Sequence, residues 1–180
     1  YSIVGRHLCA VGSRRTRQHR SRPGEPGTER SFTRGDDTSS VILPGSATQA
    51  LAAELAAETG RELAGVSLDR FADGERSVRV EGVEAGAEVV VVASTLSDSL
   101  HVELLQLQDA AREAGATRVT TVLPYMGYAR QDRSFEPGQS VSARAVARAI
   151  STGTDRVLTV NPHERQVCEY FDVPATAVDA

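Results

Sequence analysis

The chain has 180 residues, 40% of them hydrophobic and 24% charged, and this length is sufficient for one domain with a sizeable core. The formal net charge is −4, and all 20 basic residues are arginine. Residues 1–35 carry eight arginines against Glu25 and Glu29, a balance of +6, so the remainder has a balance of −10. Such an acidic body argues against general nucleic-acid binding, which requires an excess of positive charge on one face.

Cysteine content and hydropathy exclude further classes of protein. Cys9 and Cys168 sit in unrelated contexts, so they form neither a disulfide framework nor a metal cluster. No apolar run approaches the length of a membrane span, and the apolar stretch at the left end precedes the arginines, the reverse of a secretory signal. We therefore expect a cytoplasmic protein with no membrane contact.

Residues 1–40 differ in composition from the rest of the chain. They are rich in Arg, Pro and Gly without any hydrophobic period, so they cannot bury enough apolar surface to offset the entropy of ordering. We expect a disordered extension here. It would be a nucleic-acid arm, a targeting peptide, or a spurious extension with translation starting near Val41.

From Val41 onward, short apolar strands alternate with segments of helical period. Ser46 is the expected cap of the first helix and Gly60 its stop. The expected strands are 41–43, 63–69, 77–81, 88–93, 117–123 and 156–160, and the expected helices are 47–58, 99–114, 141–150 and 164–171, with a turn towards a further strand near residue 174. This alternation predicts an α/β domain over residues 41–180, with a mostly parallel sheet flanked by helices.

Polar clusters follow three of the expected strands. They are Phe71–Glu75, Tyr125–Arg133 and Asn161–His163. Ligands of open α/β sheets bind at the carboxyl ends of the strands, so we expect these clusters to converge or to serve neighbouring sites.

The cluster Phe71-Ala-Asp-Gly-Glu75 combines an aromatic face with two carboxylates around a glycine. The ring could stack on a base, and the carboxylates could accept hydrogen bonds from an amino group or a ribose. The plain alternative is an Asp-Gly hairpin turn with Phe71 in the core.

The segment Arg130-Gln-Asp-Arg133 offers two guanidinium groups and an amide. Arginine presents a fixed fork of donors that suits phosphate, so the position of this segment after a strand indicates phosphate binding. The alternative is a solvated loop with Arg–Asp pairs of little energetic value.

His163 stands at the start of an expected helix and could ligate a metal through a neutral nitrogen, or it could simply be an exposed or capping side chain. Asp132 and Asn161 could approach a hydrated Mg²⁺, which prefers oxygen ligands. The hydroxyl groups of Ser94–Asp98 could contribute to the same edge, although a helix cap explains that segment as well.

Taken together and in order, these clusters resemble the motifs of the ribose-phosphate pyrophosphokinases, also called phosphoribosyl pyrophosphate synthetases. The matching stretches are Phe71-Ala-Asp-Gly-Glu75, Pro124-Tyr-Met-Gly-Tyr-Ala-Arg-Gln-Asp-Arg133 and Arg156-Val-Leu-Thr-Val-Asn-Pro-His163. The resemblance covers residues 41–180 and is strongest to the archaeal branch. It implies a phosphoribosyltransferase-like N-terminal domain of that enzyme.

This resemblance also implies a function and a site. The family transfers the diphosphoryl group of ATP to ribose 5-phosphate, giving phosphoribosyl pyrophosphate and AMP for nucleotide biosynthesis. By the resemblance, ATP would be bound by Phe71, Asp73, Gly74, Glu75, Arg130 and Gln131, and Mg²⁺ by His163. It further implies a homo-oligomer with the ATP site at a subunit interface, where Phe71 reaches the adenine from a neighbouring subunit.

Two departures from the family pattern qualify that expectation. Asn161 replaces the usual aspartate two residues before the metal-binding histidine, which removes one charge. The catalytic loop and the ribose 5-phosphate loop of the family's second half have no counterpart in residues 1–180, so we expect no catalytic residue in this chain and no activity from it alone.

Three other functions stay open from the sequence. A non-catalytic regulatory relative would keep the fold and the oligomer interface. A phosphoribosyltransferase would share the fold, although the segment Arg130–Arg133 argues against it. A nucleic-acid-binding protein would use the arginine-rich residues 1–40.

Overall fold

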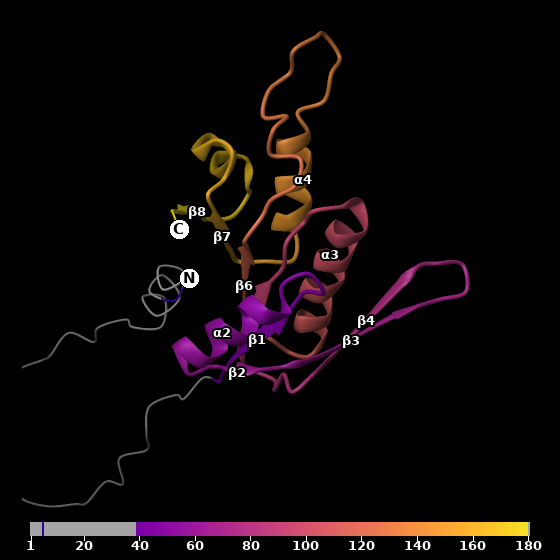
Figure 1. Ribbon diagram of the computed structural model, residues 1–180, viewed down its shortest axis with the longest axis vertical. Coiled ribbons are helices and arrows are strands. Elements are labelled where there is room, and N and C mark those ends of the chain that lie inside the picture. Colours follow the sequence, from indigo (N-terminus) through magenta and orange to yellow (C-terminus); the bar gives the residue numbers. More distant parts are fainter. Residues whose placement is uncertain (1–4, 6–38, 180) are drawn as a thin grey trace, which may run out of the picture.

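The computed structural model describes Gly5 and residues 39–179, so the expected disorder of residues 1–40 lies almost wholly outside the described residues. Strands and helices alternate along the described part, as predicted (Figure 1). The elements are β1 (Ser40–Pro44), α2 (Gln49–Thr59), β2 (Glu62–Leu63), β3 (Gly65–Arg70), β4 (Arg76–Glu81), β5 (Glu88–Val92), α3 (Asp98–Glu113), β6 (Arg118–Leu123), α4 (Ser142–Ser151), β7 (Arg156–Val160), the 3₁₀ helix η1 (Arg165–Tyr170) and β8 (Ala175–Val178).

Six of these strands form one sheet in the order β2-β1-β5-β6-β7-β8, and every neighbouring pair is parallel. This confirms the predicted parallel sheet. The central strands are runs of β-branched residues buried on both faces, as in Glu88–Val92 and Arg118–Leu123. Such strands are buried on both sides only when helices cover both faces of the sheet.

The helices provide that cover. Side chains of α2, such as Leu55, pack with Ile42 and Val90 on one face of the sheet. Side chains of α3 and α4, such as Leu104 and Ala147, pack with the opposite face. The sheet therefore lies between two helical layers, and its carboxyl edge is left to the loops.

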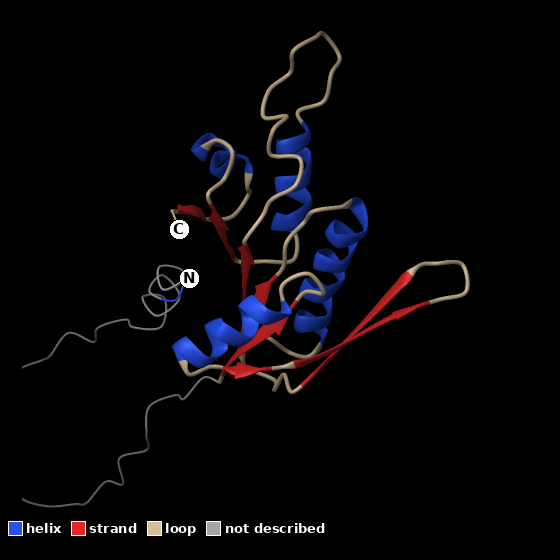
Figure 2. Cartoon of the chain, viewed as in Figure 1, coloured by secondary structure: helices blue, strands red, loops and turns tan. Residues whose placement is uncertain are grey.

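The expected strand at 63–69 is wrong as a single strand of the parallel sheet. Residues 62–63 form the short edge strand β2, and β3 turns away to pair antiparallel with β4 in a separate two-stranded hairpin. The hairpin extends to one side of the body (Figure 2). Val66, Val78 and Val80 pack its base against the core, while the tip extends beyond the helices. The alternating pattern of these residues suits a strand covered on one face only.

Consequently, the Phe71–Glu75 cluster does not lie at the carboxyl edge of the sheet. It forms the hairpin turn, with the Phe71 amide donating to the Glu75 carbonyl at 2.9 Å and Gly74 at a φ of 92°. The hairpin turn proposed as the plain alternative is thus confirmed. The placement of Phe71 in the core is wrong, because its residue surface is 60% exposed.

The first helix, α2, ends where the sequence predicted but starts later. Gly60 ends α2 with a φ of 67°, which glycine adopts without strain. Ser46 is not the cap, because α2 starts at Gln49 and is preceded by Thr48. The Thr48 hydroxyl donates to the Val92 carbonyl at 2.5 Å, and Ser46 donates to a buried carboxylate described below.

The last part of the chain refines two expectations. The short helix expected at 164–171 is the 3₁₀ helix η1, and Cys168 on it is only partly buried. The strand expected after residue 174 is β8, which pairs with β7. Among the described residues, no helix combines the length and the apolar character that crossing a membrane requires.

Replacing Leu104 by alanine should destabilise the domain strongly. Leu104 lies on α3 with none of its surface exposed, so the change leaves a cavity and should lower the free energy of unfolding by about 2–5 kcal/mol. Val102→Ala is the matched control, since Val102 lies on the same helix and is 50% exposed, and it should change stability by less than about 0.5 kcal/mol. Urea unfolding followed by circular dichroism measures both, and equal effects would contradict the placement of the core.

Candidate functional site

A cavity of about 270 Å³ opens at the carboxyl ends of β6 and β7. Tyr125, Ala129 and Arg130 line it from the segment after β6, and Asn161 and His163 line it from the segment after β7. The two strands are adjacent and parallel, so their polar loops emerge side by side. The structure therefore brings together Arg130 and His163, two of the residues predicted from the sequence.

The side chains in this cavity suit an anionic ligand. The Arg130 and His163 residues are both exposed, and Arg130 forms no ion pair with any described residue. The expected alternative, an Arg–Asp pair within the loop, is not seen among residues 39–179. An exposed guanidinium group in a concave site is available to donate two parallel hydrogen bonds to a phosphate.

Residues 125–128 follow a path that only a glycine permits at position 127. The Gly127 amide donates to Thr95 Oγ1 at 2.9 Å, and a Cβ atom there would lie 2.2 Å from the Thr95 carbonyl oxygen. Tyr128 follows with a φ of 62°, an uncommon conformation for a non-glycine residue. Its hydroxyl donates to Asp98, at the start of α3. The loop that carries Arg130 is thus fastened to the segment after β5.

His101 lies beneath this loop. Its ring contacts the Tyr128 ring at a centroid distance of 5.4 Å and an angle of 48°, and its buried Nε2 atom has no hydrogen-bond partner among the described residues. Burial lowers the pKa of His101, and the nearby Asp98 carboxylate opposes that shift only in part. The hydrogen bond to Asp98 raises the pKa of Tyr128. Both shifts favour the neutral forms of these two side chains.

Gln131 lies apart from the cavity lining, in a loop that contacts the first residues of α4. Its carbonyl accepts from the Ala143 amide at 3.1 Å, and its side-chain oxygen accepts from the Ser142 hydroxyl at 2.5 Å. The next residue, Asp132, accepts the Tyr170 hydroxyl at its main-chain carbonyl. Gln131 therefore holds the loop to the helix in this structure, and its predicted contact with ATP stays a prediction.

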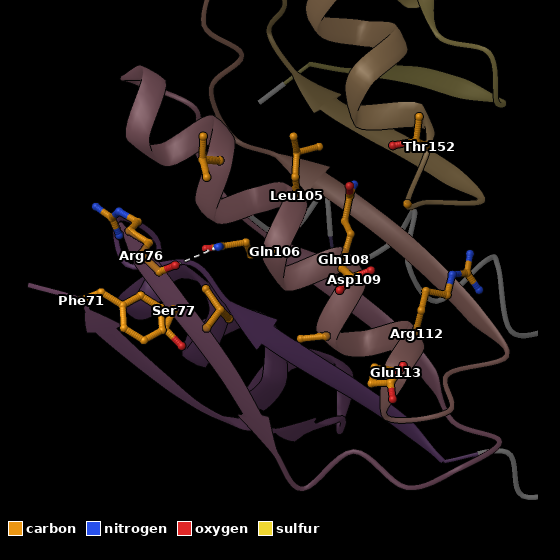
Figure 3. A pocket seen from close by; sticks show the side chains of 14 residues that line it. Phe71, Arg76, Ser77, Leu105, Gln106, Gln108, Asp109, Arg112, Glu113 and Thr152 are labelled. Atoms are coloured by element: carbon orange, nitrogen blue, oxygen red, sulfur yellow. Dashed lines mark hydrogen bonds between the residues drawn. The ribbon is translucent and has the colours of Figure 1, made fainter. Parts of the chain in front are cut away.

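The remaining predicted ligands lie on the β3–β4 hairpin. Phe71 faces an open groove of about 750 Å³ between the hairpin and α3 (Figure 3). Asp73 and Glu75 are exposed at the turn, where Asp73 Oδ1 accepts from the Glu75 amide at 3.1 Å. Phe71 and Arg130 thus line different cavities of one chain, and the three sequence clusters do not converge within it.

The cavity offers few side chains that could bind Mg²⁺ directly. No group of three or more His, Cys, Asp or Glu side chains could hold a metal ion within the described part of the chain. His163 and the amide of Asn161 offer single contacts in the cavity. These two side chains cannot complete the coordination shell of a metal ion by themselves. They do fit an ion that keeps several water ligands and is also bound by the phosphates of a nucleotide.

Replacing His101 by glutamine should reduce the acid sensitivity of the domain. The pKa of His101 lies below 6.5 in the folded state, so its contribution to stability is present above that pH and is lost as the pH falls through the folded value. Between about pH 7.5 and about pH 5, the free energy of unfolding of the wild type should fall by more than that of His101→Gln. Urea unfolding at the two pH values measures the difference, and equal losses would show that the imidazole is not desolvated.

Comparison with known proteins identifies relatives that cover most of this chain. Residues 40–153 match the family model of the N-terminal domain of ribose phosphate pyrophosphokinase. The ribose-phosphate pyrophosphokinase of Halobacterium salinarum is 64% identical over 140 residues, which cover 78% of this chain and 50% of that protein. The Methanopyrus kandleri protein of the same name is 48% identical over 141 residues, which cover 78% of this chain and 48% of that protein.

The fold agrees with these sequence matches. The crystal structure of phosphoribosylpyrophosphate synthetase from Mycobacterium smegmatis superposes with a TM-score of 0.74 at 31% identity, covering 79% of this chain and 49% of that one. The chain spans about half the length of the curated relatives it matches. The matched residues 40–153 include the clusters at Phe71 and Arg130, and the chain belongs to the ribose phosphate pyrophosphokinase family through its N-terminal domain.

Proposed function

We propose that this chain supplies the ATP-binding side of a ribose-phosphate pyrophosphokinase. In the proposed reaction, the 1-hydroxyl oxygen of ribose 5-phosphate bonds to the β-phosphorus of ATP, the bond between that phosphorus and the α–β bridging oxygen breaks, and AMP leaves. The observation that carries the proposal is the cavity shared by Arg130 and His163 at the ends of adjacent parallel strands.

The side chains of the cavity suit the donor in this reaction. Phosphoryl transfer depends mainly on positioning the reactants and on neutralising charge at phosphate oxygens. The Arg130 guanidinium group would hold the phosphates of ATP, and the imidazole of His163 would contact the Mg²⁺ that accompanies them. When bound, that ion supplies positive charge at the phosphate oxygens. Residues 125–128, fastened through Gly127 and Tyr128, would keep Arg130 in place without reorganisation.

The hairpin would recognise the other end of the nucleotide, and it would do so in a second copy of the chain. Phe71 is 60% exposed, although an aromatic ring of this size is normally buried. In one chain it lines a different groove from Arg130, and the hairpin extends to the side of the body (Figures 1 and 2). A neighbouring copy would therefore receive the ring of Phe71, with Asp73, Gly74 and Glu75 beside the adenine and ribose. This requires a homo-oligomer.

Arg130→Ala should weaken the binding of MgATP to the 180-residue chain. A hydrogen bond to a charged group contributes about 1.5–3 kcal/mol, so the dissociation constant should rise roughly tenfold or more. Isothermal titration calorimetry with MgATP measures the change. Arg148→Ala is the matched control, because Arg148 is an exposed arginine near the end of α4 that does not line the cavity. Equal affinities of the two variants would remove Arg130 from the proposed site.

A mixing experiment tests the contribution of the second copy. Phe71→Ala and Arg130→Ala should each weaken MgATP binding when alone. After the two variants are unfolded together and refolded as a mixture, some sites would combine an intact hairpin from one copy with an intact cavity from the other. The mixture should therefore recover a fraction of high-affinity sites in an equilibrium binding assay. Recovery of none, in a mixture shown to be oligomeric, would place the hairpin and the cavity of each site in the same copy.

A further inference from the structure

Glu103 is a buried carboxylate in the middle of α3, with only 1% of its surface exposed. One carboxylate oxygen accepts the Ser46 amide at 2.7 Å. The other accepts the Ser46 hydroxyl at 2.8 Å and forms an ion pair with the guanidinium group of Arg76. Glu103 therefore joins three segments that are far apart in sequence: α3, the loop after β1, and the first residue of β4.

Arg76 is held by α3 at two points. Its guanidinium group pairs with Glu103, and its main-chain carbonyl accepts Gln106 Nε2 at 2.9 Å (Figure 3). The Arg76 side chain is 18% exposed, and its buried Nε atom has no partner among the described residues. Arg76 directly follows Glu75, so the contact lies where the hairpin turn ends.

Stability alone does not explain this ion pair. Removing two charges from water costs free energy that their attraction only partly restores, and an apolar pair of similar size often stabilises a core as well. Apolar contacts, however, tolerate sliding, whereas hydrogen bonds to a carboxylate fix both distance and direction. The pair is better suited to setting the angle of the hairpin than to holding the core together.

We propose that Glu103, acting through Arg76, is a positioning residue that fixes the Phe71–Glu75 turn relative to Ser46 at the carboxyl edge of the sheet. The turn itself is exposed at every residue, so its direction depends on the point where β4 begins. The inference rests on the proposed function, in which this turn binds ATP in a neighbouring copy. A turn held at a fixed angle needs no ordering when the nucleotide binds.

The chain contains no tryptophan, so Phe71→Trp introduces a single tryptophan at the turn, and excitation at a wavelength that tyrosine does not absorb reports on this residue alone. In this background, Glu103→Gln and Arg76→Met should increase the nanosecond motion of the reporter, seen as a loss of fluorescence anisotropy. Arg79→Met is the matched control, since Arg79 lies on the same strand and its ion pair with Glu81 lies on the surface. It should leave the anisotropy unchanged. The double variant Arg76→Met/Glu103→Met, which leaves no unpaired charge, serves if a single variant fails to fold.

A second measurement separates this inference from the proposed function. With Phe71 retained, Glu103→Gln and Arg76→Met should raise the dissociation constant of MgATP roughly tenfold, as expected if only about a tenth of the molecules hold the turn correctly. Lost anisotropy with unchanged affinity would support the positioning role and overturn ATP binding by the turn. Unchanged anisotropy in folded Glu103→Gln, Arg76→Met or the double variant would overturn the positioning role itself.

Discussion

The parallel pairing of β6 with β7 is the constraint on which the candidate site depends. The register places Leu123 opposite Thr159, so both strands end at the same level of the sheet. Leu123 and Thr159 have no exposed surface, and a slip of one residue would turn every buried side chain of a strand to the opposite face. The apolar core therefore fixes the distance between the points where the segments that carry Arg130 and His163 leave the sheet.

The backbone near the cavity adopts positive φ angles, which the residues of the core strands do not adopt. Tyr128 and Asn161, each near the end of a strand, are the two non-glycine residues with positive φ among the described residues. Such conformations cost free energy and persist only where surrounding contacts hold them. At Tyr128, those contacts are the hydroxyl bond to Asp98 and the bond between the Gly127 amide and Thr95. The precision of the site thus comes from the neighbouring segment after β5 as much as from the strands that carry its ligands.

Much of the fold could be predicted from the sequence because its signals are local. Valine runs indicated the buried strands, and Gly60 indicated the end of the first helix. The turn at 71–75 was among the predicted alternatives, but the separation of β3 from the parallel sheet was not predicted. The alternation in 65–70 is compatible with either kind of sheet, and only the pairing of β3 with β4 decides between them. The buried carboxylate was missed because Ser46 and Glu103 are 57 residues apart. The one sequence signal for this buried carboxylate was that Glu103 is a charged residue next to Leu104 on the apolar face of α3.

The charges on the two parts of the proposed site determine the direction in which ATP would bind. Asp73 and Glu75 on the hairpin turn are carboxylates, which would repel triphosphate oxygens at short range. Arg130 in the cavity can attract those oxygens directly, and His163 would do so through the Mg²⁺ ion that accompanies them. In a site built from both parts, the adenine and ribose must therefore face the hairpin and the phosphates must face the cavity. The exposed ring of Phe71 then meets the one part of ATP that can stack on it, so electrostatics and stacking require the same orientation.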